Sequence, residues 1–190
     1  MHLQLLEDFY RQGRGILGRV SDEHLERLAL RLAEADKVFV LGIGHSGMFG
    51  RIFCMKLNHA GVRAYSVFDE INPPFGKGDL FVAISQSGET GTVLALVDKA
   101  KKLGGQVLGV TSGKTSTLAG KSDHLLVLEK IDQSAGVDAL GFLGDARNQN
   151  VLGSLFGFTI YIVFYALVGM IAGIRGETAG SIDGRHATLQ

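Results

Sequence analysis

The chain has 190 residues, of which 46% are hydrophobic and 20% charged, a composition typical of a folded globular protein rather than a disordered one. Its 19 basic side chains equal its 19 acidic ones, so no excess positive charge favours nucleic acid, and we expect no nucleic-acid partner. The single cysteine, Cys54, excludes an internal disulfide and favours a reducing, cytoplasmic location.

The first 36 residues predict an N-terminal helical arm. Residues 3–17 are helix-like. After Ser21, a good N-cap residue, apolar side chains recur at helical spacing from Leu25 to Leu32. We therefore expect two helices before the first strand.

Five short apolar runs predict strands that are buried on both faces of a sheet. The runs cover residues 37–43, 62–68, 79–84, 106–111 and 124–128. Helix-like stretches at 47–60 and 90–103 separate some of them and end at glycines, whereas Pro73-Pro74 makes 69–78 a loop. The alternation predicts an α/β protein with three α/β/α layers and a five-stranded parallel sheet. We expect one domain over residues 1–190, with a core at 37–174 and an extended tail at 175–190.

Residues 151–174 carry no charge, and the segment is long enough to cross a membrane. It also contains hydroxyl-bearing side chains, including Ser154, Thr159 and Tyr161, and nothing before it resembles a membrane protein. A helix that covers a sheet or pairs with a second subunit would have the same composition. We favour this second interpretation and expect no membrane partner.

Two loops that follow strands carry the strongest functional signals. Gly42–Gly47 follows the first strand and Ser85–Thr90 follows the third. If the strand order is 2-1-3-4-5, the two loops face each other at the carboxyl edge of the sheet, where such folds bind ligands. The second loop places three hydroxyls before a helix start, whose free N–H groups attract anions, and this predicts a site for a phosphorylated molecule.

Two other interpretations of these loops stay open. The hydroxyls of Ser85–Thr90 could merely cap the following helix. The glycines of Gly42–Gly47 also fit a dinucleotide-binding pattern, for which Asp69 or Glu70 is only loosely placed as the acidic ribose ligand. We regard both as weaker than the phosphate interpretation.

The sequence SQSGET at 85–90 resembles the phosphate-binding signature of the sugar isomerase (SIS) domain family, and G-x-G-x-S-G at 42–47 resembles its first ligand loop. Within this family, the ending Arg185–Leu189 and the loop from Asp69 to Pro73 resemble the 6-phospho-3-hexuloisomerases. The resemblance implies a flavodoxin-like sheet of order 2-1-3-4-5, a homodimer or homotetramer, a sugar-phosphate ligand, and neither metal nor other cofactor. It also implies the ligand-binding residues Gly44, Ser46, Gly47, Ser85, Gln86, Ser87, Gly88 and Thr90.

Two positions depart from the hexuloisomerase pattern. His45 stands where that group usually carries arginine. Gly157 follows Gly153-Ser154-Leu155-Phe156 where the group carries glutamate. If that glutamate is the group's base, this chain lacks it.

An isomerase that moves a carbonyl along a sugar phosphate needs a base and a donor to the enediolate oxygen. Candidates for the base are Glu70, His186 and His45; Glu89 is better explained by the dipole of the helix that it precedes. No histidine pair has metal-ligand spacing. We expect isomerisation through a cis-enediol, with 3-hexulose 6-phosphate as substrate. A catalytically silent sugar-phosphate sensor or partner subunit is the alternative.

The composition of the C-terminal tail suggests a separate role in the active site. Residues 175–190 show little apolar periodicity, so we expect them to pack poorly on their own subunit. Arg185 and His186 supply a cation and a titratable ring, which suit an anionic substrate and a proton transfer. We therefore expect the tail to close over an active site, either its own or that of a neighbouring subunit.

Overall fold

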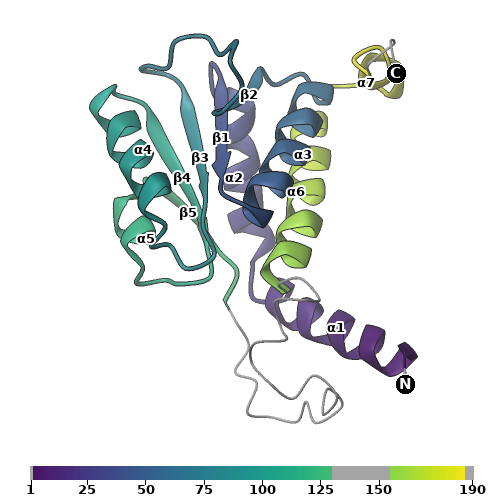
Figure 1. Cartoon of the computed structure of the whole chain (residues 1–190). Coiled ribbons are helices and arrows are strands. Elements are labelled where there is room, and N and C mark those ends of the chain that lie inside the picture. Colours follow the sequence, from purple (N-terminus) through teal and green to yellow (C-terminus); the bar gives the residue numbers. More distant parts are fainter. Residues whose placement is uncertain (1, 130–154, 187–190) are drawn as a thin grey trace.

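The computed structural model describes residues 2–129 and 155–186. At its centre lies a parallel sheet of five strands in the order β2-β1-β3-β4-β5 (Figure 1). The strands are β1 (Val38–Gly42), β2 (Ala64–Ser66), β3 (Leu80–Ile84), β4 (Gln106–Thr111) and β5 (His124–Val127). Both the parallel sheet and its order are as predicted.

Seven helices are present among the described residues. They are α1 (His2–Leu17), α2 (Asp22–Glu34), α3 (His45–His59), α4 (Gly91–Lys102), α5 (Thr117–Lys121), α6 (Leu155–Ile174) and α7 (Ala179–Asp183). The two five-residue helices, α5 and α7, were not predicted, because so short a segment shows no helical periodicity. Glycines at positions 136, 141 and 144 predict an irregular segment at 129–147, and this segment lies almost wholly outside the described residues.

The strands alternate their side chains between two apolar layers, as the two-residue repeat of a strand requires. Val38 and Val40 of β1 face the layer formed by α2, α3 and α6. Phe39 and Leu41 face the opposite layer, formed by α4 and α5. Because the sheet is covered on both faces, its central strands β1 and β3 carry no polar side chain.

The two N-terminal helices have different positions. α2 packs in the core through Leu28, Leu32 and their neighbours, so it belongs to the helical layer. α1 projects away from the sheet (Figure 1), and its Gly13 lies against Phe158 at the start of α6. Of the two helices expected in an arm, only α1 extends away.

α6 is apolar and long enough to span a membrane by length and composition. Eight of its residues are buried, and Phe164 stacks on Phe53 of α3 with ring centroids 4.0 Å apart. Tyr161 and Tyr165 remain exposed on the opposite side. The buried face shows that α6 covers the sheet, as the favoured interpretation expected.

The sheet brings the two glycine-containing loops together. β1 pairs directly with β3, and Gly42 lies opposite Ile84 in this register. Because the strands are parallel, the loops that follow them leave the sheet at the same edge. The loops at 42–47 and 85–90 are therefore neighbours, as predicted.

Candidate functional site

The loop at 85–90 is held in a tight turn by its own hydroxyls. Ser85 is buried, and its Oγ accepts a hydrogen bond from the Gly88 N–H (3.1 Å) and lies 2.8 Å from Thr90 Oγ1. Gly88 has φ +72°, and a Cβ there would collide with Ser116 Oγ. Ser85 therefore shapes the loop from within, whereas Ser87 is exposed at its surface.

The segment after β4 stabilises this turn through hydrogen bonds to its carbonyl groups. The Gln86 carbonyl accepts hydrogen bonds from Ser112 N–H (3.0 Å), Ser112 Oγ (2.7 Å) and Thr111 Oγ1 (3.2 Å). The Gly88 carbonyl accepts from the Leu118 N–H. Our sequence analysis missed these supporting hydroxyls, although Thr111 and Ser112 mark the carboxyl end of a predicted strand.

Glu89 is engaged away from the candidate site. Its Oε1 accepts a hydrogen bond from the Thr117 N–H at 2.7 Å, at the start of α5. Hydrogen bonds from the side chain and backbone of Thr117 hold the pKa of the Glu89 carboxyl below its ordinary value. The helix whose start it stabilises is α5 rather than α4, and a carboxylate held in this way is a poor candidate for the base.

The glycines at 42–47 are explained by close packing. A Cβ at Gly42 would lie 2.6 Å from the Ser46 carbonyl carbon, and one at Gly47 would lie 2.6 Å from the Gly42 oxygen. Gly44 has φ +58°, the left-handed region that favours glycine. The glycine pattern therefore lets α3 start directly against the end of β1. This close packing explains the glycines without a dinucleotide ligand.

α3 and α4, which start at this edge, share a feature that the other helices with a described N-cap lack. Their N-cap residues, Gly44 and Thr90, make no side-chain capping hydrogen bond. In contrast, α2, α5 and α7 are capped by Ser21, Ser116 and Thr178. Thr90 is a residue that normally caps a helix, but its hydroxyl contacts Ser85 instead.

The open helix starts determine the electrostatics of this edge. The first turn of a helix carries N–H groups without intrahelical partners and a partial positive charge. Two such starts lie side by side here, with the hydroxyls of Ser46 and Ser87 beside them, and neither first turn contains an acidic residue. The helix-cap interpretation of the second loop is therefore wrong for α4, and the arrangement suits a small anion.

The structure places the three candidate bases in different locations. His45 is the first residue of α3 and is exposed beside the open helix starts. Glu70 is exposed in the turn after β2, the strand that borders β1 on its other side. In that turn, Asn72 Nδ2 donates to the carbonyls of Ser66, Val67 and Asp69, which fixes the path of the loop.

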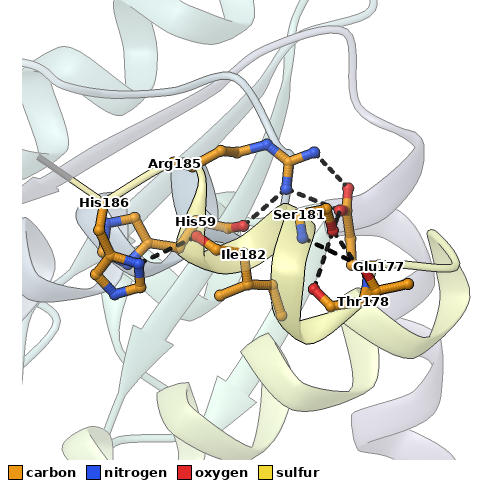
Figure 2. Close-up of polar contacts among 7 residues, drawn as sticks. All are labelled: His59, Glu177, Thr178, Ser181, Ile182, Arg185 and His186. Atoms are coloured by element: carbon orange, nitrogen blue, oxygen red, sulfur yellow. Dashed lines mark hydrogen bonds and ion pairs between the residues drawn. The ribbon is translucent and has the colours of Figure 1, made fainter. Parts of the chain in front are cut away.

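His186 lies at the other end of α3. Its ring packs on His59, with centroids 4.0 Å apart (Figure 2). α3 has 15 residues and is therefore about 22 Å long. Within one chain, His45 and His186 are consequently not brought together.

The tail around His186 is bound to its own chain. Arg185 donates to both carboxylate oxygens of Glu177, at 2.8 and 2.9 Å, and to the His59 carbonyl at 3.0 Å (Figure 2). Hydrogen bonds from Arg185 and Ser181 hold the pKa of Glu177 below its ordinary value. α7 buries no side chain, as the expected poor packing of the tail on its own subunit predicts, but Arg185 still joins the tail to α3 as far as residue 186.

His59 is buried beneath this contact. Burial and the nearby His186 hold the pKa of the His59 imidazole below its ordinary value. Its Nδ1 has no hydrogen-bond partner within the described part of the chain. The same part contains no group of three histidine, cysteine or acidic side chains placed to hold a metal.

Taken together, the parallel sheet and the paired open helix starts give this α/β protein a carboxyl edge that suits a small anionic ligand. The family comparison makes this class more specific. The SIS domain family matches residues 31–142, more than half of the chain, and the chain belongs to that family.

Individual relatives carry names that agree with this assignment. The 3-hexulose-6-phosphate isomerase of Bacillus subtilis is 28% identical over 173 residues, 90% of this chain and 89% of the relative. A solved Methanococcus jannaschii protein, inferred to be a 3-hexulose-6-phosphate isomerase, has a TM-score of 0.81 at 26% identity, over 98% of this chain and 99% of that one. The Vibrio vulnificus NanR protein, solved with ManNAc-6P, shares the fold, with a TM-score of 0.72 at 19% identity over 94% of this chain and 64% of that one.

Proposed function

We propose that this chain is a sugar-phosphate isomerase that converts 3-hexulose 6-phosphate into fructose 6-phosphate. The observation that carries the proposal is the pair of uncapped helix starts, α3 and α4, side by side at the carboxyl edge of the sheet. The name of the Bacillus subtilis relative supports the substrate, and the sugar phosphate bound to the NanR protein supports the ligand class.

In this proposal the phosphate group lies between the two helix starts. Backbone N–H groups of both first turns and the hydroxyls of Ser46, Ser87 and Thr90 donate to its oxygens. Ser85 acts indirectly, because its buried hydroxyl holds Thr90 and the Gly88 N–H in place. The remaining loop residues, Gly44, Gly47, Gln86 and Gly88, provide the close backbone approach.

The proposed chemistry moves two protons and needs no oxidant. A base removes the proton from C2 of the 3-hexulose, and the electron pair forms the C2–C3 double bond of a cis-enediolate. Reprotonation at C3 and transfer of the C2 hydroxyl proton to the oxygen on C3 give the C2 carbonyl and C3 hydroxyl of fructose 6-phosphate. The step requires only a positioned acid–base group and donors to the enediolate oxygen.

Among the three candidate bases, His45 is best placed to perform this step within one chain. It is exposed at the start of α3, beside the proposed phosphate site. Glu70 is the second candidate, because its loop follows the strand next to β1. His186 is bound at the far end of α3 and can contribute only to the site of another copy.

We further propose that the chain forms a homo-oligomer through the exposed side of α6. Tyr161 and Tyr165 are exposed there and lie against each other, with ring centroids 4.7 Å apart. Lys56 of α3 lies 5.7 Å from the Tyr165 ring centroid. An apolar helix face of this kind is typical of a subunit interface, and gel filtration should show a dimer or tetramer.

The test of this function is turnover in D2O. The purified protein should convert 3-hexulose 6-phosphate into fructose 6-phosphate and incorporate deuterium at C3, because the enediolate is reprotonated there. Sugar-phosphate binding without turnover would refute the isomerase. Turnover without any exchange would argue against the enediolate.

Binding without turnover would favour the second candidate function, a sugar-phosphate sensor. The observation that favours a sensor is Gly157, which supplies no carboxylate although it lies beside His45. A sensor would bind sugar phosphates with a large thermal shift and convert none of them.

A further inference from the structure

Gly157, in the first turn of α6, faces the proposed site. It is buried, and a Cβ at this position would lie 2.7 Å from His45 Cε1, 2.7 Å from Phe49 Cε2 and 3.0 Å from His45 Nδ1. Real Cβ atoms essentially never approach other atoms so closely, so any side chain here would displace one of the two rings.

The backbone at Gly157 does not itself require glycine. The residue lies within a helix, and it is absent from the positive-φ glycines of the described chain. Glycine is also among the poorest helix-forming residues. The requirement therefore comes from the neighbouring rings, and above all from the imidazole of His45.

The imidazole is held on two sides. It meets the ring of Phe49 edge to face, with centroids 4.7 Å apart and an interplanar angle of 77°. The Nδ1–Cε1 edge of the His45 imidazole lies against Gly157. Of the two ring nitrogens, Nδ1 lies on the Gly157 side, which leaves Nε2 as the nitrogen that we assign to the ligand.

Phe49 cannot easily move aside to relieve a larger residue at position 157. Its ring packs against Tyr161 of α6, with centroids 6.0 Å apart, one turn beyond Gly157. A side chain at position 157 would thus push mainly on His45, which is exposed and has room to turn outward.

We infer that Gly157 is a positioning residue for His45. Its missing side chain leaves the space in which the imidazole lies, and this fixes Nε2 beside the proposed phosphate site. The inference rests on the proposed function, in which His45 transfers the proton. It also connects the two positions at which the chain departs from the hexuloisomerase pattern, because each residue occupies space next to the other.

The primary test compares Gly157→Ala with Gly169→Ala. Both glycines lie in α6, but a Cβ at Gly169 meets nothing within 4 Å, so both variants share the gain in helix propensity and only the first disturbs His45. Gly157→Ala should lower kcat about 100-fold with KM changed only a few-fold, since a misplacement of about 1 Å has such an effect. Because Gly169 lies on the exposed side of α6, gel filtration must show the native assembly for both variants, and Gly169→Ala should then keep both constants.

A double variant shows whether the loss passes through His45. In the His45→Gln background, Gly157→Ala should cause almost no further loss of kcat, because the group that it displaces is already gone. Equal losses in both backgrounds would assign Gly157 a role separate from His45 and overturn the inference.

NMR separates a failure of this inference from a failure of the proposed function. In the native protein, the His45 Hε1 proton should show a nuclear Overhauser effect to the Gly157 Hα protons, whether or not the protein turns over sugar phosphates. In Gly157→Ala the effect from His45 to residue 157 should disappear, and in Gly169→Ala it should persist. If it is missing from the native protein, or if the two alanine variants behave alike, Gly157 does not position His45.

Discussion

The two ends of α3 differ in how they are completed. At its start, the N-cap Gly44 provides no side chain, and glycines bring the helix against β1. At its end, Arg185 from the tail donates to the His59 carbonyl and pairs with Glu177. One end is thus left with free donors, whereas the other is closed by the chain itself.

Because of this difference, the two ends of α3 have different roles, one in ligand binding and the other in stability. Donors that the fold leaves unsatisfied are available to a ligand, while the C-terminal carbonyl end is stabilised by a cation from the same chain. The start of α4 is likewise uncapped, because the hydroxyl of its N-cap Thr90 contacts Ser85 instead. We therefore expect substitutions at the open end to change ligand binding and rate, and substitutions at the closed end to change stability.

The largest effect is expected from His45→Gln at the open end. Loss of a general acid–base group should lower kcat by about 10²- to 10⁴-fold, while sugar-phosphate affinity stays near native. Steady-state kinetics and calorimetric binding measure the two quantities. Unchanged kcat would remove His45 from the mechanism and leave Glu70 and His186 as the candidates.

His186→Gln tests whether the residue at the closed end of α3 also contributes to the rate. If each site is complete within one chain, this variant should keep its rate. If the tail serves a neighbouring subunit, both variants lose rate, but oligomers mixed from His45→Gln and His186→Gln chains should regain activity that neither has alone. A mixture that stays inactive would exclude the shared site.

Ser87→Ala should have the next largest effect. A hydrogen bond to a charged group contributes about 1.5–3 kcal/mol, so the affinity for fructose 6-phosphate should fall roughly 10- to 150-fold. The matched change at the closed end is Ser181→Ala, which removes a hydroxyl from the α7 capping box and should leave affinity unchanged. Equal affinities for the two variants would mean that the hydroxyl of the second loop does not contact the phosphate.

Arg185→Ala should affect stability rather than binding. It removes the bonds to Glu177 within the tail and the bond to the His59 carbonyl, which joins the tail to α3. We expect a lower thermal midpoint and faster proteolysis after residue 174, with native sugar-phosphate affinity. A native midpoint would show that the tail is not stabilised by this contact.

The smallest expected effect is a dependence of stability on pH at His59. Its pKa in the folded chain lies below the ordinary value of 6.5, so the unfolded chain binds its proton more readily. Stability from the neutral ring is therefore complete above about pH 6.5 and falls as the pH drops below it. The loss measured by thermal unfolding between about pH 7 and pH 5 should be smaller in His59→Gln.

The sequence was sufficient for the sheet and for the neighbouring positions of the two loops, because both depend on local patterns. Apolar runs identify buried strands, and Ser85–Thr90 follows one of them. The contacts between side chains could not be predicted from the sequence. Thr90 is expected to cap a helix, and only the fold shows that its hydroxyl contacts Ser85 instead. Arg185 meets His59 across 126 positions, and Gly157 meets His45 between helices, so no periodicity could reveal either contact.

The central claim is that the open starts of α3 and α4 together bind the phosphate of a sugar phosphate. The most direct measurement is an amide NMR titration with fructose 6-phosphate, with fructose as the control. We predict that the phosphate ester shifts the amides of Ser46 and Gly47 together with those of Ser87 and Gly91, and leaves Arg185 unmoved, while fructose shifts none of these. Shifts confined to one loop, or centred on the tail, would contradict the account.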